Sequence, residues 1–144
     1  ERAGGLPPDG LIELCFSGRY TGEELRAKLL SGWGLVSYLG TRDLREAFKM
    51  AESDPKAKIV MDAFVYQIAK GIGEFAAVLD GEVDAIVFTG GMAHSERFVE
   101  MISKKVRFIG RIEVFPGEDE LAALAEGALR VIKGEEYAKE YSYK

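Results

Sequence analysis

The sequence predicts an α/β fold that is rich in helices and contains a small parallel sheet. Two short apolar runs with β-branched residues, 83–88 and 112–115, are bounded by turn residues, which is typical of buried strands. A helical pattern lies between them and another follows, and strands joined through a helix pair in parallel by a right-handed crossover. Residues 1–80 carry only helical patterns.

The first helices are indicated by their capping residues. Asp9 is placed to cap a short helix over residues 11–16. Thr21 is followed three positions later by Glu24, which is the pattern of a capping box, and predicts a helix over residues 22–30. Glycines then interrupt the pattern.

Residues 35–40 are predicted to be a short apolar connection. Thr41 is the expected cap of the next helix, which runs to about residue 51. Pro55, at a first helical position that needs no N–H, starts the longest helix, over residues 55–79.

One face of that long helix is apolar, because large apolar residues recur at steps of three and four. They are Met61, Phe64, Ile68, Ile72, Phe75 and Leu79. Gly71 and Gly73 interrupt the helix, and each costs roughly 1 kcal/mol relative to alanine. We expect close packing against another backbone to compensate for this cost.

Beyond the first strand, a helix is predicted over residues 95–105 and another over residues 118–133. Residues 116–117, Pro-Gly, stop the second strand. The tail, 135–144, is predicted to be helical or frayed.

Composition and charge exclude several classes of partner. A net charge of −5 argues against nucleic acid, and the scattered Lys and Arg argue against an anionic membrane surface. No apolar run has the length of a membrane span, and no signal-peptide pattern opens the chain, so a cytoplasmic location is expected.

The single cysteine, Cys15, is expected to be a small buried apolar residue.

Two segments are placed to bind a ligand, because open parallel sheets bind ligands at the carboxyl ends of their strands. Gly90 and Gly91 follow the first strand and allow close approach of a backbone, although such a pair is also an ordinary tight turn. Acidic residues 118–120 follow the second strand. They suit a magnesium ion, or they complement the dipole of the following helix. His94 is expected to be an exposed or helix-capping side chain rather than a catalytic base.

Neither of the common phosphate-binding loops is present. The sequence contains no G-x-G-x-x-G motif and no G-x-x-x-x-G-K-[ST] motif. A dinucleotide-binding fold of the usual kind and a Walker-type loop are therefore not supported.

Four segments, in order along the chain, resemble the acetate and butyrate kinase family. Residues 83–95 (VDAIVFTGGMAHS) resemble its adenosine-binding strand and turn, and residues 35–46 (LVSYLGTRDLRE) resemble the segment that packs on the adenine. Residues 114–131 (VFPGEDELAALAEGALRV) look like the C-terminal motif of its butyrate kinase branch, and residues 1–7 (ERAGGLP) resemble a loop with a reaction-centre arginine.

The resemblance implies a fold, a reaction and site residues. The fold would be an incomplete actin-like ATPase (ribonuclease H-like) C-terminal domain over residues 1–144. The reaction would move a phosphoryl group between ATP and butyrate, with Mg²⁺ bound to ATP or ADP. The implied residues are Asp43, Leu44 and Arg45 at the adenine, Gly90, Gly91, Met92 and Ser95 at the adenosine, Asp119 or Glu120 at the magnesium, and Arg2 at the transferred phosphoryl group.

Parts of the family pattern have no counterpart in this sequence. These are the N-terminal domain with its phosphate loop and catalytic aspartate, the second phosphate loop and the reaction-centre histidine. We therefore expect a partial nucleotide-binding domain that is inactive alone. It would self-associate through an open sheet edge or pair with a separate N-terminal half. The alternative is a nucleotide-binding or assembly module without chemistry.

Overall fold

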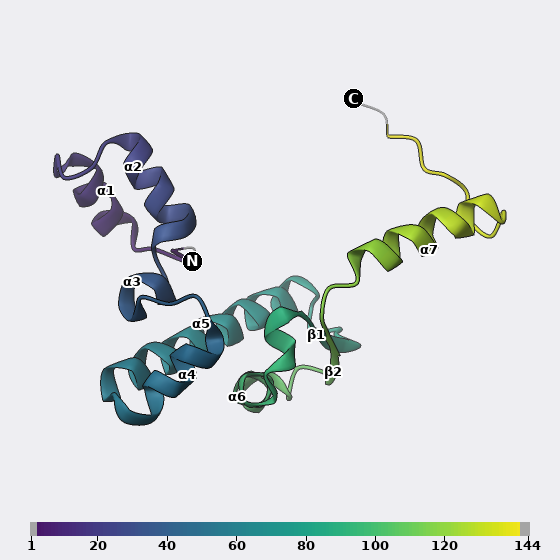
Figure 1. Ribbon diagram of the computed structural model, residues 1–144. Helices are drawn as coiled ribbons and strands as arrows, with labels where there is room; N and C mark the ends of the chain where they lie inside the picture. The colour runs from purple at the N-terminus through teal and green to yellow at the C-terminus, as the bar shows by residue number, and fades with distance from the viewer. Residues whose placement is uncertain (1–2, 142–144) are drawn as a thin grey trace.

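The computed structural model describes residues 3–141 of the chain (Figure 1). The helices of the first half are α1 (Pro8–Phe16), α2 (Gly22–Ala27), a π-helical turn η1 (Lys28–Gly32), α3 (Leu35–Leu39), α4 (Leu44–Ser53) and α5 (Pro55–Val78). The second half contains β1 (Ala85–Gly90), a 3₁₀ turn η2 (Gly91–His94), α6 (Glu96–Val106), β2 (Arg111–Pro116) and α7 (Glu120–Ile132).

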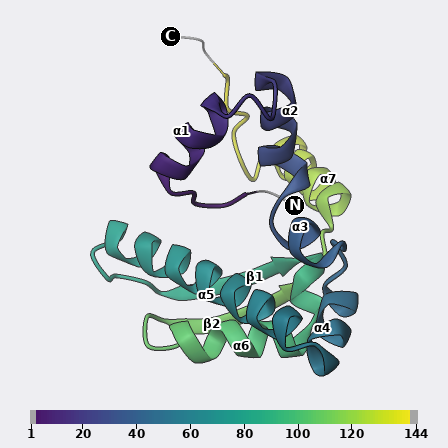
Figure 2. The same ribbon diagram turned by 90° about the vertical axis from the view of Figure 1, so that its left-hand side faces the viewer.

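The described part of the chain forms a helix-rich fold with one small sheet, as predicted. Strands β1 and β2 pair in parallel, with Ile86 opposite Ile112, and α6 provides the crossover between them. Helices α5 and α6 both pack on one face of this sheet (Figure 2). The other face is open, and Val87 and Phe115 on it are 56% and 61% exposed.

The hydrophobic core lies where α4, α5 and α6 meet the covered face of the sheet. Its buried members are Leu35, Ala47, Phe48, Met61, Val65, Ile86, Phe98, Ile102 and Val106. Phe98 is central to it: the Phe98 ring stacks on Phe64, with centroids 5.6 Å apart, and meets Phe48 edge-on at 6.4 Å. These contacts attach α6 to both α5 and α4.

Helices α1 and α7 lie outside this core. Neither contains a buried residue, and Figure 1 shows them on two separate arms that extend from the α4–α6 body. The expectation that Cys15 is buried is wrong, because α1 has no neighbour that covers the cysteine.

Several predicted boundaries are confirmed. Thr21 and Glu24 form the predicted capping box: the Thr21 Oγ1 accepts from the Glu24 N–H, and Glu24 Oε2 accepts from the Thr21 N–H. Pro55 occupies the first turn of α5. Helix α6 lies within one residue of its predicted bounds.

Other expectations are wrong. Residues 35–39 form helix α3 instead of a connection, because positive-φ glycines at 34 and 40 bracket one helical turn. Asp43 caps α4 in place of Thr41, whose hydroxyl turns to Glu46. The N-cap of α1 is Pro7 rather than Asp9.

Two further expectations concern the C-terminal part and the long helix. Of the two alternatives for the tail, helical or frayed, the helical one is wrong for residues 135–141. A Cβ added at Gly71 or Gly73 would meet nothing within 4 Å, so close backbone packing does not compensate for these glycines. In the described part of the chain, no helix is both long and apolar enough to cross a membrane.

Candidate functional site

The carboxyl ends of β1 and β2 are joined by a pair of glycines. The Gly90 N–H donates to the Gly117 carbonyl at 3.0 Å, and the Gly117 N–H donates to the Gly90 carbonyl at 3.1 Å. Gly90 has φ 78° and Gly117 has φ 99°, a region that side-chain-bearing residues rarely adopt. The Thr89 hydroxyl also donates to the Gly117 carbonyl, at 3.4 Å. We call Gly90 and Gly117 the glycine pair.

Two side chains pack over the glycine pair. A Cβ at Gly90 would lie 3.2 Å from Oε1 of Glu118, and a Cβ at Gly117 would lie 3.6 Å from Nε2 of His94. His94 is exposed, as expected. Beside the pair lies an open depression of about 700 Å³. It is lined by Thr89, Gly90, Phe115, Pro116, Gly117, Glu118, Asp119, Glu120 and Ala123.

The turn after β1 is firmly anchored. Ala93 in this turn is only 5% exposed. The Ser95 Oγ caps α6 by accepting from the Phe98 N–H at 3.3 Å, and Phe98 is a core residue. Met92, by contrast, is 51% exposed and offers an apolar surface at the mouth of the sheet. The Ser95 hydroxyl proton is not used by the cap and is available for donation to a ligand.

The acidic segment after β2 is held much less firmly. Asp119 occupies the N-cap position of α7, but its side chain makes no capping hydrogen bond, and Glu120 is the first residue of that helix. Within residues 3–141, no three His, Cys, Asp or Glu side chains come together as a metal site. Residues 118–120 therefore do not form a cluster of three carboxylates. Two carboxylates remain a suitable set for Mg²⁺, which is commonly bound by one or two carboxylates together with substrate phosphates.

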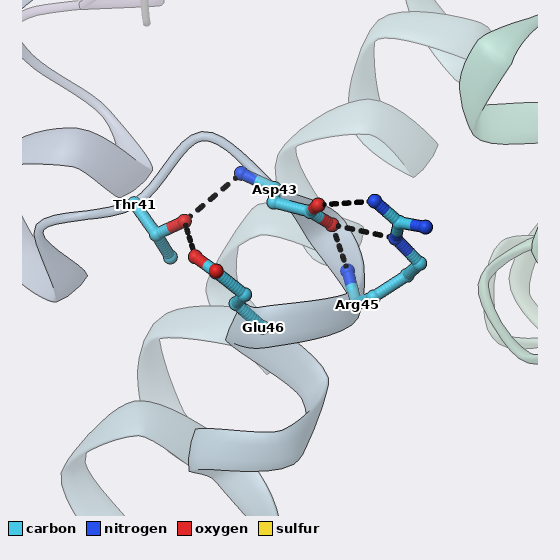
Figure 3. A network of polar contacts seen from close by, with 4 residues as sticks. All are labelled: Thr41, Asp43, Arg45 and Glu46. Carbon is cyan, nitrogen blue, oxygen red and sulfur yellow. Dashed lines mark hydrogen bonds and ion pairs between the residues drawn. The ribbon is translucent and has the colours of Figure 1, made fainter.

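The start of α4 carries a polar network, drawn in Figure 3. Asp43 accepts from the Arg45 N–H at 2.8 Å, from its Nε at 3.1 Å and from its Nη2 at 2.6 Å. The side-chain hydrogen bonds from Arg45, followed by its backbone N–H, lower the pKa of Asp43 to about 2. The Thr41 hydroxyl, in turn, accepts from the Asp43 N–H and donates to Glu46. Leu44 packs against the core, whereas the Arg45 side chain is 88% exposed.

Arg97 connects α4 with the helix that follows the turn. Its Nη1 donates to Oε1 of Glu52 at 3.1 Å, and its guanidinium lies 4.5 Å from the centroid of the Phe48 ring. Phe48 lies five positions after Asp43, a rise of about 7.5 Å along the helix. The α4 network and the turn after β1 are therefore attached to the same part of the core.

The structure places the predicted site residues in three groups. Gly90, Gly91, Met92 and Ser95 lie together at the turn after β1, Asp119 and Glu120 lie across the glycine pair, and Asp43, Leu44 and Arg45 start α4. Arg2 lies outside the described residues. Gly117 and Glu118 were not predicted from the sequence as partners of Gly90. The Pro-Gly at the end of β2 did indicate a turn there, and Gly117 has a positive φ.

Comparisons with known proteins show which proteins this chain is similar to. The chain is 50% identical over 142 residues to a protein named probable butyrate kinase 2 from Caldanaerobacter subterraneus subsp. tengcongensis, covering 98% of this chain and 40% of that protein. It is 49% identical over 142 residues to butyrate kinase 2 from Clostridium acetobutylicum, with the same coverage. The chain thus spans about 40% of the length of these curated relatives.

A solved structure supports the fold. A propionate kinase from Francisella tularensis subsp. tularensis SCHU S4 superposes with a TM-score of 0.72 at 22% identity, covering 83% of this chain and 37% of that one. The described residues therefore have part of the actin-like ATPase fold. The model of the acetokinase family matches residues 2–136, and the chain therefore belongs to the acetokinase family.

Proposed function

We propose that this chain is the C-terminal, nucleotide-binding part of a butyrate kinase. The complete enzyme would transfer a phosphoryl group between ATP and butyrate, giving ADP and butyryl phosphate. The observation that carries the proposal is the meeting of the Gly90–Gly91 turn with the acidic segment at the carboxyl ends of two parallel strands. Similarity to proteins named butyrate kinase favours butyrate as the acid.

The residues have distinct proposed roles. Gly91 lets the backbone approach the adenosine closely, since nothing lies within 4 Å of a Cβ built there. Met92 contacts the apolar part of the nucleoside, and Ser95 donates a hydrogen bond to it. Asp43, Leu44 and Arg45 form the wall of the adenine site, with Arg45 fixed by Asp43. Asp119 and Glu120 would hold Mg²⁺, which neutralises charge on the nucleotide phosphates. Arg2 would stabilise charge on the transferred phosphoryl group.

We infer that the described part of the chain does not by itself assemble a phosphoryl-transfer site and that the chain is inactive alone. Phosphoryl transfer needs cations at the transferred group and protection from water. The depression at the strand ends is open, contains three carboxylates and has no Lys or Arg among its described lining residues. The missing cations would come from elsewhere in a complete enzyme.

A calorimetric titration of the full chain with ADP and Mg²⁺ tests the nucleotide site. Saturable binding is expected, and Gly91→Val is expected to abolish it, because a branched side chain fills the space that the nucleoside needs. Gly10→Val is the matched control, since Gly10 also has open space around it and lies in α1. Equal loss of binding in both variants, or binding that survives Gly91→Val, contradicts the assignment.

Trapping of butyryl phosphate with hydroxylamine tests the chemistry. With ATP, butyrate and Mg²⁺, the purified chain is expected to give no hydroxamate above the protein-free background. Turnover by the chain alone would refute the inference that it is inactive without further parts.

An assembly module without chemistry is the second candidate. It is favoured by α7, on which Leu121, Leu124 and Ile132 are 84%, 71% and 78% exposed. Such a module would form a homo-oligomer or pair with a separate N-terminal half. Light scattering after size exclusion distinguishes a monomer from these assemblies, and a chain that assembles but binds no ADP would favour this second function.

A further inference from the structure

The glycine pair connects two segments that the proposed function assigns to different parts of the nucleotide. On one side, the Gly90 backbone leads directly into η2, and on the other the Gly117 backbone leads into residues 118–120. The two hydrogen bonds at 3.0 and 3.1 Å form the one isolated bridge of the described residues, between Gly90 at the end of β1 and Gly117 just beyond β2. They fix how far the acidic segment lies from the turn.

The two segments differ in what else holds them. The turn is anchored by buried Ala93 and by the Ser95 cap on Phe98, so it keeps its place without Gly117. The acidic segment has no such anchor: α7 has no buried residue, and Asp119 makes no capping hydrogen bond. The position of Asp119 and Glu120 therefore depends on the backbone of Gly117.

Gly117 can be neither a metal ligand nor a nucleotide contact through a side chain, because it has none. Its φ of 99° is open to glycine and strained for other residues. The nearest atom to an added Cβ is His94 Nε2 at 3.6 Å, an ordinary contact, so the backbone conformation and not a clash is what a substitution disturbs.

We infer that Gly117 is a positioning residue: through its hydrogen-bonded pair with Gly90 it places the carboxylates of the acidic segment against the metal-bound phosphates of a nucleotide held at the turn. This inference rests on the proposed function. It separates two parts of nucleotide binding. Contacts to the nucleoside depend on the turn, whereas the contribution of Mg²⁺ depends on the glycine pair.

The test compares Gly117→Ala with Gly81→Ala. Gly81 also has a positive φ, 79°, and open space around a Cβ, but it lies in the turn before β1 at the opposite end of the strand. Both variants therefore carry similar backbone strain, and only Gly117→Ala disturbs the pair. For the parent chain and for each variant, calorimetry gives the dissociation constants of adenosine, of ADP with EDTA and of ADP with Mg²⁺.

In the parent chain and in Gly81→Ala, Mg²⁺ is expected to tighten ADP binding by the same factor, within about twofold. In Gly117→Ala this factor is expected to fall to about 1, while adenosine binding stays within about twofold of the parent. If Gly117 had only a structural role, Gly117→Ala would lower stability without selectively changing the factor by which Mg²⁺ tightens ADP binding.

Three outcomes would overturn the inference. If Gly117→Ala keeps the parent's magnesium factor, the glycine pair does not position the acidic segment. If the parent itself shows a factor of 1, there is no magnesium-dependent binding for the pair to support. If the parent binds no ADP at all, both the proposed nucleotide site and this inference are refuted. The first two outcomes refute only the inference about Gly117 and leave the proposed nucleotide site in place, so the two failures are distinguishable.

Discussion

Removing the Phe98 ring is expected to destabilise the fold severely, because that ring joins three helices. Phe98 is 3% exposed, stacks on Phe64 and meets Phe48 edge-on. Truncation of a buried phenylalanine to alanine costs about 3–5 kcal/mol, from lost transfer free energy and the cavity that remains. Domains of this size are stable by only about 5–15 kcal/mol, so Phe98→Ala removes a large share of the stability.

Urea denaturation followed by far-UV circular dichroism measures the effect. With a slope of about 2 kcal/mol per molar urea, a loss of 3–5 kcal/mol lowers the midpoint by roughly 1.5–2.5 M. Phe108→Ala is the matched control: the same substitution at a residue that is 83% exposed. Its expected change is within about 0.5 kcal/mol. Equal midpoints for the two variants would refute the placement of Phe98 at the centre of the core.

The remaining predictions concern local features. Gly71→Ala in α5 is expected to raise the free energy of unfolding by about 0.5–1 kcal/mol, because alanine favours a helix and its Cβ meets nothing; thermal unfolding measures this, and a loss of stability would mean an unseen close neighbour. Asp43 is expected to titrate near pH 2 by carboxyl NMR, and in Arg45→Ala to titrate nearer its ordinary value. Since the folded-state pKa is lowered, this carboxylate stabilises the fold above about pH 4, and the contribution is lost as the pH falls towards 2. An unchanged titration midpoint of Asp43 in Arg45→Ala would exclude the ion pair. Thr21→Ala is expected to weaken α2 by about 1 kcal/mol, seen as faster hydrogen exchange at the Glu24 amide and little change in global stability, because α2 lies on an arm outside the core; an unchanged exchange rate would contradict the capping box.

Local signals in the sequence predicted the starts of two helices. The Thr21–Glu24 capping box satisfies backbone groups within three residues, and Pro55 lacks the N–H that would need a partner at the start of a helix, so both effects can be predicted without knowing the fold. The apolar run at 83–88 predicted the first strand, although the strand itself is displaced by two residues, to Ala85–Gly90. Its extension to Gly90 depends on pairing with β2, which lies far along the chain.

The errors arose where the outcome depends on tertiary partners. An apolar helical stretch around Cys15 reads as buried, but α1 has no neighbour to cover it. Helix α3 is a single turn set by flanking glycines, too short for a periodic pattern. At the site, the sequence indicated the turn at Gly90 and the acids at 118–120, but the hydrogen bonds that join them link residues 27 positions apart. No local spacing predicts such a pair.

Amide shift mapping of the full chain during titration with ADP and Mg²⁺ tests the proposed nucleotide site most directly. We predict saturable shifts concentrated in residues 90–95 and at Asp43 and Arg45, with magnesium-dependent shifts at Asp119 and Glu120. The amide shifts of residues in α1 and in the tail should not change. Shifts that never saturate at millimolar ADP, or that fall mainly on α1 and on residues 121–132 of α7, would contradict a nucleotide site at the carboxyl ends of β1 and β2.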